Sequence, residues 1–139
     1  MLEDGSVYEG TARGDFKETA CEIVFNTSMT GYVEILTDPS YAGQGVVMTY
    51  PMIGNYGISR EDFESERLQP SAFIVHELSS DPSNFRCTDT IENLLKEYNI
   101  PCISGVDTRA VVKKLRESGT MRGVLTSDIG DRERLMDVI

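Results

Sequence analysis

The spacing of apolar residues changes about halfway along the chain, and this change constrains the fold more than any other feature. In the first half, short runs rich in Val, Ile, Phe, Tyr and Thr are separated by Gly, Pro, Asp or Ser, which is typical of strands. Two of these runs, 46–48 and 73–75, are apolar at every position, which indicates strands that are buried on both faces. We expect strands at 6–9, 22–26, 45–50 and 71–77.

The second half has the pattern of helices that alternate with strands. Asp89 and Glu92 have the spacing of a helix-capping pair, and an amphipathic helix is predicted by Ile91, Leu94, Leu95 and Tyr98. Asp107 is placed to begin a second helix, which buries Ala110, Val111 and Leu115 and ends at Gly119. We also expect strands at 101–104 and 121–126 and a third helix at 131–139. This order predicts an α/β or α+β domain with both parallel and antiparallel pairing.

The length and charge of the chain narrow the classes of function. A chain of 139 residues is expected to form one domain, 1–139. Its net charge of −10 disfavours a nucleic-acid partner, and the basic run 109–116 is interpreted as an exposed helical face. No apolar run is long enough to span a membrane, and the first residues do not have the pattern of a signal peptide. We therefore expect a soluble, cytoplasmic protein without a membrane partner.

The residue types that usually carry catalysis are sparse. The three cysteines, Cys21, Cys87 and Cys102, are widely spaced, and the single histidine is His76, so no metal site is predicted. No cysteine lies in a glycine-flanked turn that would expose a nucleophile, and each is interpreted as a buried structural thiol. A hydrolase that uses Cys87 or Cys102 with His76 is kept as an alternative.

The segment 37–41 is the better candidate for a contact with another molecule. Asp38 can accept a hydrogen bond from the backbone two residues on, and Pro39 fixes its own φ angle. Such a turn holds the hydroxyl of Ser40 at an exposed, stiff tip. The residues alone leave two interpretations open: a site for a polar small molecule or partner domain, and a rigid corner between strands.

Six segments, read together, resemble one family. They are 25–32, 34–41, 49–57, 83–86, 105–109 and 115–119. In this order they resemble the amino-terminal domain of the small, glutamine-hydrolysing subunit of carbamoyl phosphate synthetase. The resemblance implies a three-layer β/β/α swivelling domain with one mainly parallel and one antiparallel sheet.

The resemblance also implies a function that several domains share. In this family the small subunit carries a second, C-terminal glutamine amidotransferase domain, which hydrolyses glutamine, and we expect that domain to be absent from this chain. The ammonia passes to the large subunit of the heterodimer, a ligase that binds ATP and Mg and makes carbamoyl phosphate for arginine and pyrimidine biosynthesis. The implied partners are the large subunit, the amidotransferase domain and glutamine at the domain boundary. No cofactor and no catalytic residue are expected in this domain.

The resemblance implies a role for one residue in particular. In the family, the serine of the Asp-Pro-Ser-Tyr turn helps to bind glutamine, and here that residue is Ser40. Asp38, Pro39 and Tyr41 are expected to support the turn, and the corner 26–28 is expected to support it or to face the partner domain. The alternative function is an autonomous small-molecule-binding or interaction domain with the same fold.

Overall fold

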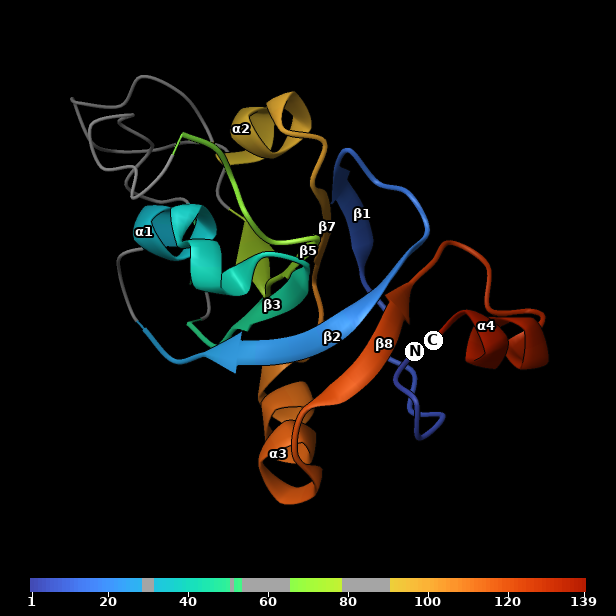
Figure 1. The fold of residues 1–139 in the computed structure, drawn as a ribbon. Coiled ribbons are helices and arrows are strands. Elements are labelled where there is room, and N and C mark those ends of the chain that lie inside the picture. The colour runs from blue at the N-terminus through green and yellow to red at the C-terminus, as the bar shows by residue number, and fades with distance from the viewer. Residues whose placement is uncertain (29–31, 51, 54–65, 79–90) are drawn as a thin grey trace.

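A six-stranded mixed sheet forms the centre of the molecule (Figure 1). The computed structural model describes residues 1–28, 32–50, 52–53, 66–78 and 91–139. The strands of the large sheet are, in spatial order, β1 (Thr11–Gly14), β7 (Pro101–Ser104), β5 (Ala72–Ile74), β3 (Gln44–Met48), β2 (Thr19–Asn26) and β8 (Met121–Leu125). The four central strands are parallel, and the two edge strands, β1 and β8, are antiparallel to their neighbours.

Two further strands form a small parallel sheet. These are β4 (Met52–Ile53) and β6 (Glu77–Leu78). They follow β3 and β5 in the sequence, so the same two segments of the chain pair in both sheets.

Helices cover both faces of the large sheet (Figure 1). Helices α1 (Tyr32–Thr37) and α2 (Ile91–Glu97) lie on one face, and α3 (Thr108–Ser118) lies on the other. A short 3₁₀ helix, η1 (Pro39–Tyr41), joins α1 to β3. In the described part of the chain, no helix is long and apolar enough to cross a membrane.

The alternation of side chains along β3 and β5 produces two separate cores. Val46 and Phe73 belong to the core beneath α1 and α2, whereas Val47 and Ile74 belong to the core beneath α3. All four side chains are buried. The prediction of strands that are buried on both faces is therefore confirmed, and it explains why these runs have no polar positions.

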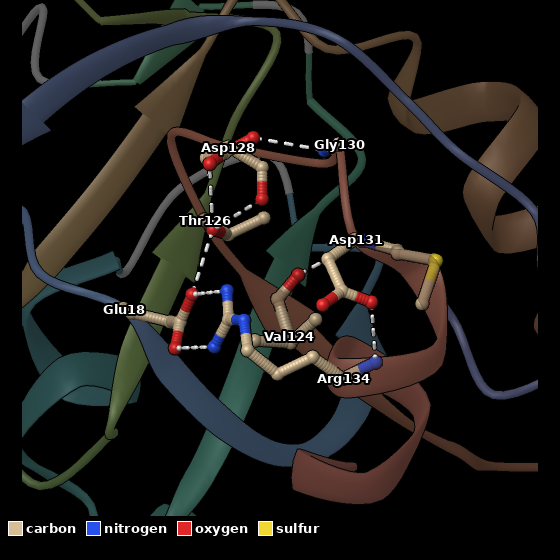
Figure 2. Close-up of polar contacts among 8 residues, drawn as sticks. Glu18, Val124, Thr126, Asp128, Gly130, Asp131 and Arg134 are labelled. Atoms are coloured by element: carbon tan, nitrogen blue, oxygen red, sulfur yellow. Dashed lines mark hydrogen bonds and ion pairs between the residues drawn. The ribbon is translucent and has the colours of Figure 1, made fainter.

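Helix α4 (Arg132–Val138) packs at the edge of the sheet beside β8 (Figure 1). Its Leu135 is fully buried, and the guanidinium of Arg134 donates two hydrogen bonds of 2.9 Å to the carboxylate of Glu18 (Figure 2). The same carboxylate accepts a hydrogen bond from the hydroxyl of Thr126 at 2.9 Å. Together these hydrogen bonds lower the pKa of Glu18 from its usual 4.5 to about 2, and the hydrogen bond from Arg134 makes the largest contribution.

The helices of the second half are largely where the sequence predicts them. The carboxylate of Asp107 accepts a hydrogen bond from the N–H of Ala110 at 3.1 Å, so Asp107 caps α3, and Gly119 ends this helix with a φ of 80°. Asp131 caps α4 in the same way. Helix α2 ends at Glu97, before the predicted Tyr98, and Asp89 lies outside the described residues.

Two local predictions are wrong. Residues 6–9 form no strand, and the edge strand β1 begins at Thr11, while Tyr8 packs against the core beneath α3. The predicted strand 71–77 is interrupted at Val75 and His76, between β5 and β6. Helix α1 lies in a segment for which the sequence predicted no helix or strand.

The fold class is confirmed as α/β, and the described residues form a mixed sheet of six strands and four helices. The three-layer β/β/α arrangement is not confirmed. Among the described residues, the antiparallel strands are the two edges of the large sheet and do not form a second sheet.

Candidate functional site

The predicted site lies at the corner that α1 and η1 form after β2. Helix α1 is anchored to the core by Tyr32, Val33 and Leu36, whose side chains are buried. The hydroxyl of Thr37 donates to the carbonyl of Val33 at 2.8 Å, and the N–H of Gln69 donates to the carbonyl of Leu36 at 2.7 Å. The end of α1 is thus fixed, so the turn that follows starts from a rigid position.

The turn itself is held by Asp38. One oxygen of its carboxylate accepts a hydrogen bond from the backbone N–H of Ser40 at 2.9 Å, and its carbonyl accepts one from the N–H of Tyr41 at 3.1 Å. Pro39 occupies the first turn of η1, where its missing N–H is not needed. Ser40 is exposed, and its hydroxyl forms no hydrogen bond with the described residues. The turn therefore presents a hydroxyl that is available to another molecule.

Asn26 connects this turn to the ends of two central strands. Its side-chain amide donates to the hydroxyl of Tyr41 at 3.0 Å, and its side-chain oxygen accepts from the N–H of Ser28 at 2.8 Å. Its backbone carbonyl accepts from the N–H of Thr49 at 3.1 Å, just beyond β3. Asn26 belongs to the corner 26–28 that was expected to support the turn or to face the partner domain, and its hydrogen bond to Tyr41 joins that corner to the turn.

An open depression lies beside the turn. It is lined by Asn26, Glu34, Ile35, Asp38, Pro39 and Tyr41. Two of these residues carry carboxylates, so the depression favours a cationic group such as an ammonium. The structure thus brings together Asp38, Pro39 and Tyr41 in the wall of one depression, and Ser40 does not line it.

The cysteines that the structure describes do not have the environment of a nucleophile. Cys21 and Cys102 are buried and free. Burial raises the pKa of Cys21 to about 11 and that of Cys102 to about 12, so both remain thiols at neutral pH. His76 is exposed, with its Nδ1 3.2 Å from the carbonyl oxygen of Val106. These findings argue against a hydrolase based on Cys102, whereas Cys87 lies outside the described residues.

The described residues also contain no group of three or more His, Cys, Asp or Glu side chains that could hold a metal ion together. The chemistry available at the α1–η1 corner is therefore that of a hydroxyl, two carboxylates and backbone groups. Such a set suits the binding of a polar molecule.

Comparisons with known proteins point in one direction. The sequence model of the family described as "Carbamoyl-phosphate synthase small chain, CPSase domain" matches residues 1–125. A carbamoyl phosphate synthase small chain from Caldanaerobacter subterraneus subsp. tengcongensis is 55% identical over 125 residues, which cover 90% of this chain and 35% of the relative. The small chain from Archaeoglobus fulgidus is 52% identical over 135 residues, which cover 97% of this chain and 38% of the relative. This chain therefore spans little more than a third of the length of these relatives.

Proposed function

Because this chain belongs to the family of carbamoyl-phosphate synthase small chains, we propose that it is the N-terminal docking domain of a glutamine-dependent carbamoyl phosphate synthetase. The observation that carries the proposal is the Asp38-held turn, which presents an unpaired Ser40 hydroxyl in a chain that matches this family from residue 1 to residue 125. The proposal includes the three-layer β/β/α swivelling arrangement that the resemblance implies for residues 1–139.

The proposed work of this domain is positioning. A glutamine amidotransferase domain elsewhere in the small chain hydrolyses glutamine, and the ammonia is used by the large subunit of a cytoplasmic heterodimer. The large subunit binds ATP and Mg and makes carbamoyl phosphate for the arginine and pyrimidine pathways. The buried thiols of Cys21 and Cys102 support an assignment of the glutaminase chemistry to the other domain.

Ser40 is the proposed contact with glutamine across the domain boundary. A hydroxyl can both donate a hydrogen bond to an amino acid's polar groups and accept one from them. Asp38 supports this role by fixing the backbone of Ser40, and the hydrogen bond from Asn26 to Tyr41 fixes the other side of the turn. Because the turn is already ordered, little conformational entropy is lost when glutamine binds.

Mixing the chain with the large subunit tests the docking role. We expect a stable complex when this chain is combined with a separately expressed large subunit, measured by size-exclusion chromatography with light scattering. Circular dichroism of the chain alone supplies the control for folding. A folded chain that stays separate from the large subunit would contradict the docking role and would assign docking to the amidotransferase domain.

A further inference from the structure

Helix α3 lies on the sheet face opposite to α1 (Figure 1), and a second polar surface lies between α3 and the residues that follow β2 and β3. It is an open groove, called here the α3 groove, and it is lined by Thr27, Thr49, Arg109, Val112, Lys113, Arg116 and Glu117. Thr27 and Thr49 follow the carboxyl ends of the parallel strands β2 and β3. This edge of a parallel sheet is where α/β proteins usually bind their ligands.

Within the part of the chain that the structure describes, the three cations of the α3 groove have no acidic partner. Arg109, Lys113 and Arg116 are exposed and form no ion pair or hydrogen bond with the residues that the structure describes. The guanidinium of Arg116 lies over the ring of Phe25, with 5.4 Å between its carbon and the ring centroid. By contrast, Lys114 on the same helix pairs with Asp4 at 3.0 Å.

This absence of partners is unexpected in a chain with a net charge of −10. Among the residues that line the groove, only Glu117 carries a carboxylate, so positive charge is in excess there. A local excess of cations attracts acidic partners, whereas the acidic remainder of the protein surface repels them. The excess of positive charge therefore favours an acidic ligand in the α3 groove.

We propose that the α3 groove docks an acidic segment of a partner protein, with carboxylates about 6 Å apart. We identify the large synthetase subunit as the protein that carries this segment, and this identification rests on the proposed function. The carboxylates pair with Arg109 and Lys113, and Arg116 binds a third one at the end of the groove.

The spacing of the cations supports a segment over a single small anion. Arg109 and Lys113 are four residues apart on α3, which corresponds to about 6 Å along the helix axis, and Arg116 extends this row to about 10 Å. Alternate side chains of an extended chain are separated by a similar distance, about 6.6 Å. A row of this length can pair with several carboxylates at once, and alternating acidic residues of an extended segment supply them.

The other residues of the groove suit an extended backbone. Thr27 and Thr49 line the groove, and the hydroxyl of Thr49 donates to the carbonyl of Asn26 at 3.3 Å, which leaves its oxygen able to accept. Val112 is buried and provides an apolar floor. A peptide could therefore place its carboxylates on the cations and its N–H groups on the hydroxyls.

The first test uses this chain alone and a defined probe. We expect an acetylated and amidated peptide of four Glu-Ser repeats to shift the amide resonances of Thr27, Thr49 and α3 in ¹⁵N NMR titrations. Arg109→Glu/Lys113→Glu should weaken this binding at least tenfold, because it reverses two of the three cations. The control Lys96→Glu/Arg132→Glu makes the same change of net charge on α2 and α4, and should leave the binding within twofold.

Three results of this titration would overturn the inference. They are the absence of shifts in the α3 groove at millimolar peptide, equal affinities for the two double variants, and tighter binding of inorganic phosphate than of the peptide. The last result would assign the groove to a small anion.

The second test separates the inference from the proposed function. In a complex with the large subunit, a carbodiimide should couple the amine of Lys113 to a carboxylate of the partner, and mass spectrometry should identify the joined peptides. Lys113→Arg should keep the complex and lose this cross-link. If Arg109→Glu/Lys113→Glu binds the large subunit as well as the parent chain does, the docking function stands and the α3 groove is not its site. If the parent chain binds the acidic peptide but not the large subunit, the docking function fails and another protein carries the segment.

Discussion

The hydroxyl of Ser40 is the one group of this domain to which we assign a contact with substrate. In a complete small chain, Ser40→Ala would remove the hydroxyl and keep the hydrogen bond between Asp38 and the backbone N–H of residue 40. We expect the KM for glutamine to rise about fivefold, which corresponds to about 1 kcal/mol for one lost hydrogen bond. Activity with added ammonia should not change, because ammonia bypasses the glutamine site. Steady-state kinetics with each nitrogen donor measure both effects.

A matched control for this variant lies on the same chain. Ser118→Ala removes an exposed hydroxyl at the end of α3, away from the α1–η1 corner, and should leave the KM for glutamine unchanged. If Ser40→Ala also leaves that KM unchanged, Ser40 is not part of the glutamine site.

For single residues, the sequence predicted the hydrogen bond within the turn at Asp38, but it did not predict which residues contact the turn from other elements. The hydrogen bond that Asp38 accepts from the N–H two residues on follows from local backbone geometry, and it is present. The link from Asn26 to Tyr41 joins residues 15 apart, and it depends on how β2 and α1 are packed. The family resemblance suggested that the corner 26–28 supports the turn, but the pairing of Asn26 with Tyr41 became visible only in the fold.

At the scale of elements, the attachment of α4 to the sheet should depend on pH. The pKa of Glu18 is lowered to about 2 by Arg134 and Thr126, so the carboxylate stabilises the fold while it is charged. This contribution is fully present above pH 4.5 and is lost as the pH falls from 4.5 toward 2, where the folded form also takes up the proton. We expect Glu18→Gln to lower the Tm at pH 7 and to have little effect near pH 2.

Thermal unfolding of both proteins between pH 2 and pH 7 measures this difference. Leu135→Ala is the reference, because it removes buried apolar contacts of the same helix and should lower the Tm by a similar amount at every pH. A difference between Glu18→Gln and the parent chain that stays constant with pH would contradict the role of the Glu18–Arg134 pair (Figure 2).

Long helices with clear capping residues were predicted from the sequence, whereas short helices without them were not. Helix α3 has eleven residues, an Asp107 cap and a Gly119 stop, and it was predicted from these signals. Helix α1 has six residues, among them β-branched Val33, Ile35 and Thr37, and it has low intrinsic helix propensity. Its stability comes from burial of its side chains against the sheet, which a local reading of the sequence does not contain.

At the scale of the whole molecule, the two buried thiols report on the integrity of the two cores. Cys102 belongs to the core beneath α1 and α2, and Cys21 belongs to the core beneath α3. In a Cys87→Ser variant, we expect a thiol reagent at pH 8 to label both at least about a thousandfold more slowly than in strong denaturant, because labelling requires unfolding. Absorbance of the released thiolate gives the rates, and mass spectrometry gives the site.

The comparison of the two cysteines contains its own control. If both cores open together, Cys21 and Cys102 should be labelled at the same rate. Rapid labelling of one thiol in the folded chain would show that its core opens independently, and would contradict a single cooperative unit.

The type of sheet was predictable from the sequence, whereas the order of its strands was not. Continuous apolar runs in β3 and β5 indicated a sheet with both faces covered, and the alternation of the second half indicated parallel pairing. The order of strands was beyond sequence reasoning, because β1 pairs with β7 across most of the chain, as in the pairing of Thr11 with Ser104. Such distant pairings depend on the packing of the whole domain.

Residues from opposite ends of the sequence are held by the same edge strand. The amino group of Met1 donates to the carbonyl of Val124 at 2.8 Å, and the guanidinium of Arg122 donates to the carbonyl of Ile139 at 2.8 Å, so Met1 and Ile139 both lie at β8 (Figure 1). A change in this one strand would therefore disturb segments that are far apart in the sequence. The order of the elements along the chain is thus separable from their order in space.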